Sequence, residues 1–342
     1  MRYPVIICLA LLTITSSLSA QKKENSFTAM FYNVENLFDT IDAPDFADEE
    51  FTPGGKKAWD YTKYEKKLTD ISRVILSLPG KETPAVIGFA EVENEKVLRD
   101  LCMTRGLARK NYKALVFEGD DPRGIDCGLI YQEEQFKYKS HELIPVKDLS
   151  GKEYILRGIL HVIGDAPDGD PIHIFVNHWK SRGGGVAKTE SLRVYAAIAL
   201  RRQLDKLMSR EQNPRYIIMG DFNDEPTNRS LTDILHAGNK RKNPWITDSY
   251  NLFYDVHNMG NIGSHNYKGE WSMLDQIIVS YSLINQSKGL STTYESGKIL
   301  KEEWMLFHNE KDGSKVPNRT YGGDNYYGGI SDHLPIYVNF SW

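Results

Sequence analysis

The chain has 342 residues, of which 40% are hydrophobic and 26% charged, and its formal net charge is −4. This composition is ordinary for a globular protein and excludes collagen-like, low-complexity and intrinsically disordered chains. The acidic balance also argues against a protein that coats nucleic acid non-specifically, because such binding needs a strongly basic surface. A local basic groove remains compatible with it.

The first 20 residues differ in composition from the rest of the chain. Arg2 is their only charged residue, residues 4–14 are mostly apolar, and residues 15–20 are small and polar apart from Leu18. This pattern is typical of a secretory signal peptide with cleavage after Ala20, and the apolar run is too short to span a bilayer comfortably. We therefore expect export to the periplasm or the medium, with an uncleaved N-terminal anchor as the alternative. No later segment is apolar enough to be a transmembrane span.

Residues 21–342 are expected to form one domain, because no Gly/Ser-rich or Pro-rich linker divides them. Without residues 1–20 the net charge becomes −5, since only Arg2 is lost. Two cysteines remain, Cys102 and Cys127, and their spacing excludes a zinc–cysteine cluster. Whether they form a disulfide stays open at this stage. We expect a monomer.

Apolar periodicity predicts strands interrupted by helices. Strands are expected at residues 26–34, 85–90, 112–118, 125–131, 154–163, 172–177, 216–219, 273–279 and 331–340, and helices at residues 61–78, 95–105, 190–208 and 230–235. Residues 40–60 and 308–329 are polar and contain turn-forming residues, and we expect them to be loops. This order of elements favours a layered α/β architecture.

The apolar run 216–219 leads directly into Gly220, Asp221, Phe222 and Asn223. In an extended chain, residues two apart face the same way, so the carboxylate of Asp221 and the carboxamide of Asn223 would point into one space. The alternative is an ordinary polar turn, in which Asp and Asn are common.

Similar polar residues stand at or beside the ends of the other expected strands, and together they make a chemically coherent set. The set consists of Asn33, Glu91, His178, Asp221, Asn223, Asp275, Asp332 and His333. Its carboxylates and carboxamides are the ligands that Mg²⁺, Mn²⁺ or Ca²⁺ prefer. A carboxylate bonded to an imidazole can activate water, and a cation with a second imidazole can stabilise charge on a phosphoryl group. The set fits hydrolysis of a phosphate ester.

Six blocks of the sequence resemble the endonuclease/exonuclease/phosphatase superfamily, whose fold is that of deoxyribonuclease I. The blocks are residues 31–36, 89–94, 177–179, 220–223, 274–277 and 331–335. They occur in the order found in that family and cover most of the mature chain. The resemblance implies a four-layered α/β sandwich, with two packed mixed β-sheets flanked by helices and the site at one edge of the sheets.

The resemblance also implies catalytic roles. His333 is similar to the general base of the family, and Asp275 to the carboxylate that orients it. Asp221 matches the acid near the nucleophilic water, and Asn223 matches the amide that holds the phosphate. His178 matches the second histidine, which contacts a phosphate oxygen or assists the leaving group.

The same resemblance implies a metal site. Glu91 matches the principal metal ligand of the family, and Asn33 and Asp332 match further positions of the metal site. Glu35 stands where some relatives carry an aspartate, and its longer side chain leaves its coordination open. The expected ion is Mg²⁺, with Mn²⁺ as a substitute and Ca²⁺ less favoured.

Four further residues are assigned beside these. Asp126, inside the expected strand 125–131, is a candidate for orienting His178, because a buried carboxylate needs a partner; exposure to water is the alternative. Arg182 and Arg123 are assigned to the substrate, since guanidinium groups match phosphate oxygens, and Arg182 is preferred because it lies close to His178 and to three glycines. Asn177 is assigned to the substrate as part of the family block 177–179. For Arg123, an ordinary charged turn residue is an equal alternative.

The sequence therefore predicts an exported, Mg²⁺-dependent phosphoesterase, foremost an endonuclease that hydrolyses phosphodiester bonds with a His/Asp-activated water. The expected partner is a phosphate-ester substrate, foremost nucleic acid. The alternatives are a phosphatase or a phospholipid or sphingomyelin phosphodiesterase on the same fold, and after these a non-catalytic binding module.

Overall fold

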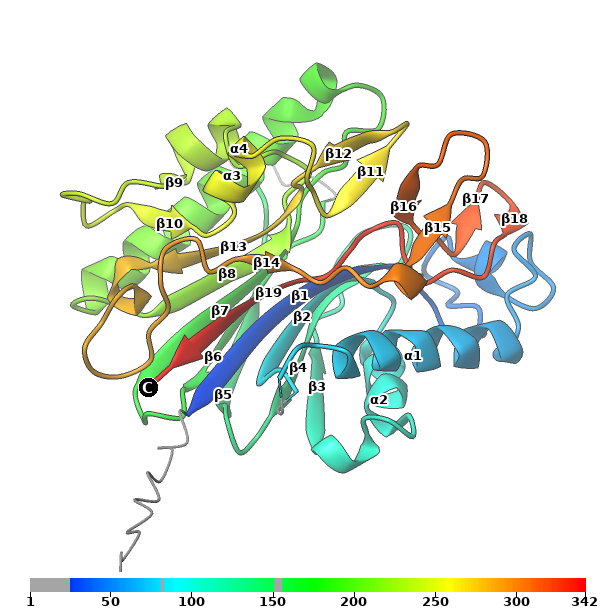
Figure 1. Cartoon of the computed structure of the whole chain (residues 1–342), viewed down its shortest axis with the longest axis horizontal. Helices are drawn as coiled ribbons and strands as arrows, with labels where there is room; N and C mark the ends of the chain where they lie inside the picture. The colour runs from blue at the N-terminus through cyan, green and yellow to red at the C-terminus, as the bar shows by residue number, and fades with distance from the viewer. Residues whose placement is uncertain (1–24, 81–82, 151–155) are drawn as a thin grey trace, which may run out of the picture.

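Two β-sheets packed face to face form the centre of the protein in the computed structural model, which describes residues 25–80, 83–150 and 156–342 (Figure 1). The first sheet has the order β14 (Lys298–Ile299), β19 (Ile336–Ser341), β1 (Ser26–Leu37), β2 (Val86–Val92), β4 (Asp126–Gln132), β3 (Tyr112–Val116). The second has the order β5 (Lys137–Ile144), β6 (Ile159–Asp165), β7 (Pro171–His178), β8 (Tyr216–Asp221), β13 (Asp275–Ser280), β10 (Ser249–Asn251), β9 (Ala237–Gly238). Both sheets are mixed, because β1 and β2 are parallel in one and β7 and β8 are parallel in the other.

Helices cover the outer face of each sheet. The helices α1 (Tyr61–Leu76) and α2 (Glu95–Met103) lie on the first sheet, and α3 (Val186–Arg210) lies on the second (Figure 1). Both helices on the first sheet begin at a polar cap, since the side chains of Asp60 and Asn94 accept hydrogen bonds from backbone amides in their first turns.

Three hairpins are formed by the strand pairs β11 (His265–Tyr267) and β12 (Glu270–Ser272), β15 (Leu306–His308) and β16 (Lys315–Pro317), and β17 (Tyr321–Gly322) and β18 (Asn325–Tyr326). The short helical elements are α4 (Tyr254–Asn258) and the π turn Ser230–Ile234. The 3₁₀ turns are Glu49–Phe51, Ala108–Lys110, Tyr281–Leu283 and Glu303–Met305. The hairpins gather at the edge of the sandwich toward which β1 and β2 run (Figure 1).

Alternation along the strands assigns each apolar side chain to one of three cores. In β8, for example, Ile217 and Met219 pack between the two sheets, whereas Ile218 packs against α3. A third core lies between the first sheet and its two helices. The four layers and the α/β fold class predicted from the sequence are therefore confirmed.

Some local predictions need correction. Residues 308–329, predicted to be one long loop, contain the strands β16, β17 and β18, and His308 is the last residue of β15. Strand β5 was not predicted, because its side chains are mostly polar and exposed. The last strand begins at Ile336, so the preceding Asp-His pair lies in a loop. Of the expected strand 154–163, residues 154 and 155 lie outside the described part, and so does the expected signal peptide.

The register of the strands brings the predicted strand ends to one edge of the sandwich. In the second sheet His178 pairs with Asp221, and Asp221 pairs with Asp275. The side chains of these three residues lie on the same strand face as the side chains that pack between the sheets. The side chain of Asn33, toward the end of β1, does so too.

Two other features follow from the described residues. Both Cys102 and Cys127 are buried and free, which answers the question of a disulfide between them. Within the described ranges, no helix has both the length and the apolar character that crossing a bilayer requires.

Candidate active site

The backbone departs from regular strand geometry where the site begins. Four non-glycine residues there have positive φ angles: Glu35 (50°), Asn36 (54°), Glu91 (63°) and Asn223 (50°). Such angles are uncommon outside glycine and cluster at functional sites. At Glu91 the angle coincides with a shift in strand register between Ala90 and Val92. Regular alternation would send this side chain toward the helices with Phe89, and the irregularity turns it toward the site instead.

His333 and Asp275 form a buried pair. The Nδ1 atom of His333 lies 2.6 Å from Oδ2 of Asp275, and Nε2 lies 3.8 Å from Oδ2 of Asp221. Burial alone would lower the pKa of His333, but the charges of Asp275, Asp221 and Asp332 outweigh it and hold the pKa well above its usual value. Nδ1 donates to Asp275 in both protonation states, so once Nε2 loses its proton its lone pair faces the site.

The loop that carries His333 is tied to strand β1. The Ser331 hydroxyl donates to the Asn33 carbonyl at 2.7 Å and accepts from the His333 backbone amide at 3.0 Å. A residue near the C-terminus is thereby fixed beside the first strand of the chain.

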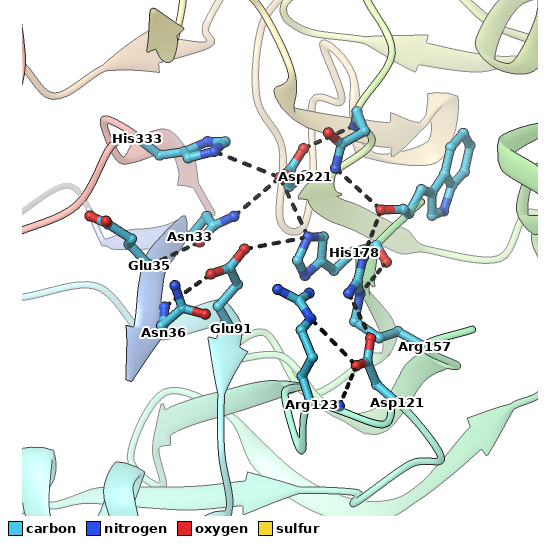
Figure 2. Close-up of polar contacts among 12 residues, drawn as sticks. Asn33, Glu35, Asn36, Glu91, Asp121, Arg123, Arg157, His178, Asp221 and His333 are labelled. Atoms are coloured by element: carbon cyan, nitrogen blue, oxygen red, sulfur yellow. Dashed lines mark hydrogen bonds and ion pairs between the residues drawn. The ribbon is translucent and has the colours of Figure 1, made fainter. Parts of the chain in front are cut away.

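Asp221 lies at the centre of the site (Figure 2). Its Oδ2 accepts from the Asn33 carboxamide at 3.1 Å, and its Oδ1 accepts from the Asn223 backbone amide at 2.9 Å. Burial raises the pKa of Asp221 to about 6, and the nearby His333 opposes this shift. The carboxylate thus links Asn33 of the first sheet to the loop that follows β8 of the second.

Glu91 and His178 close the other side. One Glu91 oxygen accepts from the Asn36 backbone amide at 2.9 Å, and the other lies 3.8 Å from Nε2 of His178, which is also 3.7 Å from Asp221. Burial, together with the charges of Arg157 and other cations, lowers the pKa of His178 well below its usual value, so this imidazole is neutral. Its Nδ1 is buried and has no hydrogen-bond partner among the described residues. The proton therefore belongs on Nε2, which faces both carboxylates.

The donors around this space fit a divalent cation. Asp221, Asp275 and His333 offer ligand atoms within 4.8 Å of one another, but Asp275 is engaged with His333. Glu91 is more accessible than Asp221 and Asp275, with 16% of its side chain exposed. Its oxygen that is not bound to Asn36 faces the side of Asp221 and Asn33 (Figure 2). Carboxylate and carboxamide oxygens of this kind suit Mg²⁺ or Mn²⁺.

Asp332, predicted to lie at the metal, is partly exposed and pairs with Arg319 at 2.6 Å. Burial would raise its pKa, but the charges of His333, His265 and Arg319 hold the pKa below its usual value. The carboxylate is therefore ionised, and one of its oxygens is engaged by the guanidinium group.

Glu35 does not face the metal side of the site. Its two carboxylate oxygens accept from the backbone amides of Thr320 at 2.7 Å and Tyr321 at 3.3 Å. The carboxylate points away from Glu91 (Figure 2). In place of the metal contact suggested by the resemblance, the structure gives Glu35 the task of anchoring the loop before β17.

Asp126 does not reach His178. Its Oδ1 accepts from the Gly119 backbone amide at 3.0 Å, which closes the loop before β4, while Nδ1 of His178 has no hydrogen-bond partner in the described part of the chain. The predicted orienting contact is therefore replaced by a local one.

The residues assigned to the substrate take three different positions. Asn177 is fully buried and bonds to backbone carbonyls and to Trp179. It precedes His178 in the same strand, so its side chain points to the opposite face, toward α3. It therefore holds the end of the strand and does not reach the substrate side. Arg182 donates to the Asn223 carbonyl at 2.7 Å and so supports that loop. Arg123 is half exposed, and its guanidinium group points toward Glu91 and His178 (Figure 2).

The sequence did not reveal two further residues of this region, Arg157 and Asp121. Arg157 is buried and donates to the carbonyls of His178 and Trp179 at 3.0 Å each and to Asp121 at 2.8 Å. The signal was present: an arginine inside the apolar segment 154–163 needs a buried partner.

The geometry agrees with the comparison with protein families. Residues 28–341 match the model described as the Endonuclease/Exonuclease/phosphatase family. The chain belongs to this family. The prediction of the superfamily is therefore confirmed, and so is that of a hydrolase acting on phosphate esters, the reaction class of the family. Among curated proteins none matches the sequence significantly.

Solved structures share the fold at low sequence identity. The human Nocturnin catalytic domain with bound sulfate is 15% identical, with 92% of this chain and 94% of that chain covered and a TM-score of 0.52. A mannosyl-6-phosphatase of Bacteroides thetaiotaomicron is also 15% identical, with 92% and 100% covered and a TM-score of 0.54. TDP2 of D. rerio, complexed with a single-strand DNA product, is 13% identical, with 93% and 100% covered and a TM-score of 0.53.

The position of Asp126 predicts a pH-dependent loss of stability. Burial raises the pKa of Asp126 to about 7, whereas an aspartate in the unfolded chain ionises near pH 4. The folded state therefore loses stability as the pH rises from about 4 to about 7, and the loss is complete above pH 7. Asp126→Asn keeps an oxygen for Gly119 and removes the ionisation. We expect it to raise the free energy of unfolding by about 2 kcal/mol more at pH 8 than at pH 5.

Urea unfolding of both proteins at the two pH values measures this difference. Asp170→Asn removes a carboxylate whose side chain is 72% exposed and controls for the loss of one negative charge. An equal gain at pH 5 and pH 8 for Asp126→Asn would contradict the prediction.

Proposed function

We propose that this chain is an exported, Mg²⁺-dependent phosphodiesterase that cleaves nucleic acid internally. The observation that carries the proposal is the buried Asp275–His333 pair, with Nε2 of His333 directed toward Asp221. This arrangement supplies a base whose tautomer and orientation are fixed by a carboxylate behind it.

In the proposed reaction, Nε2 of His333 accepts a proton from water as the water oxygen bonds to the phosphorus. The P–O bond to the leaving alkoxide breaks in the same step, and the released oxygen takes a proton from solvent. Asp275 stabilises the imidazolium that forms, and Asp221 accepts a hydrogen bond from the same water and so aligns it. The Nε2–H group of His178, which faces the side of Glu91 and Asp221, donates to a phosphoryl oxygen.

Two further groups complete the site. Asn223 donates one amide hydrogen to the Trp179 carbonyl at 3.2 Å and keeps the second for the phosphate. Glu91, with Asn33 and Asp221 beside it, would hold the cation, which when bound neutralises charge on the phosphoryl oxygens.

His333→Ala removes the base and is expected to lower kcat by about 10²–10⁴-fold. Asp275→Asn is expected to lower kcat as well, because it removes the charge that stabilises the imidazolium. Hydrolysis of bis(p-nitrophenyl) phosphate and of plasmid DNA in Mg²⁺ measures both effects. His141→Ala, on the outlying strand β5, is the matched control. A folded His333→Ala protein that cleaves every substrate at the wild-type rate would sink the proposal.

A phosphatase or a phospholipid or sphingomyelin phosphodiesterase is the alternative, favoured by the acidic net charge of −4 and by the likeness in fold to a mannosyl-6-phosphatase. A substrate panel separates these functions. It contains plasmid, single-stranded DNA, RNA, sugar phosphates and sphingomyelin, each tested with Mg²⁺, Mn²⁺, Ca²⁺ or chelator. For a nuclease we expect cleavage with Mg²⁺ or Mn²⁺, none with chelator, and a KM for DNA that rises steeply with salt because phosphate contacts release counterions.

Other results of this panel would point elsewhere. Cleavage of a sugar phosphate alone, with little dependence on salt, would favour the phosphatase. No cleavage, together with no heat of Mg²⁺ binding in calorimetry, would favour a non-catalytic binding module.

Export is part of the proposal and rests on the composition of residues 1–20. The protein recovered from the periplasm or the medium should begin at Gln21. N-terminal sequencing tests this, and a protein that begins at Met1 and stays with the membrane fraction would instead indicate an uncleaved anchor.

A further inference from the structure

Arg157 is a buried cation that holds the backbone of the active site. It precedes β6, and only 6% of its side chain is exposed. Its Nε donates to the His178 carbonyl and its Nη2 to the Trp179 carbonyl, each at 3.0 Å. Two neighbouring carbonyls at the end of β7 are therefore bound by one planar group, which fixes the direction in which the His178 ring leaves the strand (Figure 2).

The third contact of the guanidinium group reaches the other sheet. Nη1 of Arg157 donates to Oδ2 of Asp121 at 2.8 Å, and Oδ1 of Asp121 accepts from the Arg123 backbone amide at 2.9 Å. Asp121 lies in the turn before β4, and its carbonyl accepts from Gly124 at 2.8 Å. The turn that presents Arg123 is thus attached through Asp121 and Arg157 to the strand end that presents His178.

The Trp179 carbonyl extends this connection to the third part of the site. It accepts from Arg157 and also from the Asn223 carboxamide at 3.2 Å, while the Trp179 amide donates to the Asp221 carbonyl at 2.9 Å. His178, Arg123 and Asn223 come from three separate segments, and one buried guanidinium group lies between them.

We propose that Arg157 is a positioning residue of the active site, which acts through His178 and Arg123 and does not touch the substrate itself. The inference rests on the proposed phosphoesterase function. Burying an arginine is costly unless its charge and its donors are satisfied. Here the contact to His178 is direct, and the contacts to Asp121 and Trp179 connect the group to Arg123 and Asn223. A lysine has a single charged nitrogen and cannot bind two adjacent carbonyls and a carboxylate in one plane.

Arg157→Lys tests the inference. We expect kcat for bis(p-nitrophenyl) phosphate to fall by about 10–100-fold, because a displacement of about 1 Å in a positioned group is enough for such a loss, with KM changed by less than about threefold. Arg123→Met should do the reverse and raise KM more than it lowers kcat, since Arg123 is directed toward the substrate side. In the Arg157→Lys background the effect of Arg123→Met on KM should shrink, because the turn is already displaced.

Arg201→Lys is the matched control for damage to stability. Arg201 is also buried and donates to a backbone carbonyl, that of Thr247 at 2.8 Å, and to Asp205, but on the α3 side of the second sheet. We expect its melting temperature to fall as much as that of Arg157→Lys, with kcat unchanged. Asp121→Asn is the second variant, in case Arg157→Lys does not fold, and it should lower kcat at least threefold.

The outcomes are distinct. A wild-type protein that hydrolyses no phosphate ester refutes the proposed function, whatever the variants do. An active wild type with an Arg157→Lys variant, or in its place an Asp121→Asn variant, at the wild-type kcat overturns the positioning role. An equal loss of kcat in Arg201→Lys overturns it too, because the effect would then be one of stability alone.

Discussion

The site depends on the register of three neighbouring strands. Because β8 lies between β7 and β13, its last residue, Asp221, has His178 on one side and Asp275 on the other. The strand period of two then directs all three side chains to the space between the sheets. A shift of one residue in either pairing would turn the imidazole or the carboxylates toward α3, so the same apolar alternation that builds the core also assembles the reactive groups.

Placing these groups at the edge of an apolar core has electrostatic consequences. Burial raises the pKa of Asp221 and lowers that of His178, whereas the pKa of His333 rises because Asp275 outweighs burial. Two histidines that both lie within 4 Å of the same Asp221 oxygen are thus given opposite tendencies to bind a proton by their different neighbours. Such a separation is what acid–base chemistry needs from a pair of like residues. It follows from the carboxylate behind the His333 ring, and from burial together with nearby positive charge at the His178 ring.

The sequence predicted the layers and the polar strand ends because both depend on local patterns: apolar alternation, and polar residues where that alternation stops. Apart from the contact of Asp275 with His333, which the family resemblance implied, it did not predict contacts that depend on a partner distant along the chain. Glu35 and Glu91 are both acids at the end of a run of buried strand residues, and both have positive φ angles, yet the first binds the amides of Thr320 and Tyr321 and the second turns toward the site. Nothing in the local sequence distinguishes the two outcomes.

Asn177 shows the opposite case, since alternation from His178 was sufficient to place it toward α3, and the family block led to a different assignment.

The loops around the site are held by two buried cations, Lys67 beside the first sheet and Arg157 beside the second. On the first sheet, Lys67 of α1 contacts the Glu35 carbonyl and the Thr320 hydroxyl, while the Glu35 carboxylate binds the backbone of the same loop. On the second, Arg157 and Asp121 join the end of β7 to the turn before β4. In both cases a charged group satisfies backbone atoms that the end of a strand leaves unpaired. Backbone groups at a strand end cannot bond to a neighbouring strand, and here they bond to a buried charged group instead. These bonds fix loops that apolar packing alone would leave free to move.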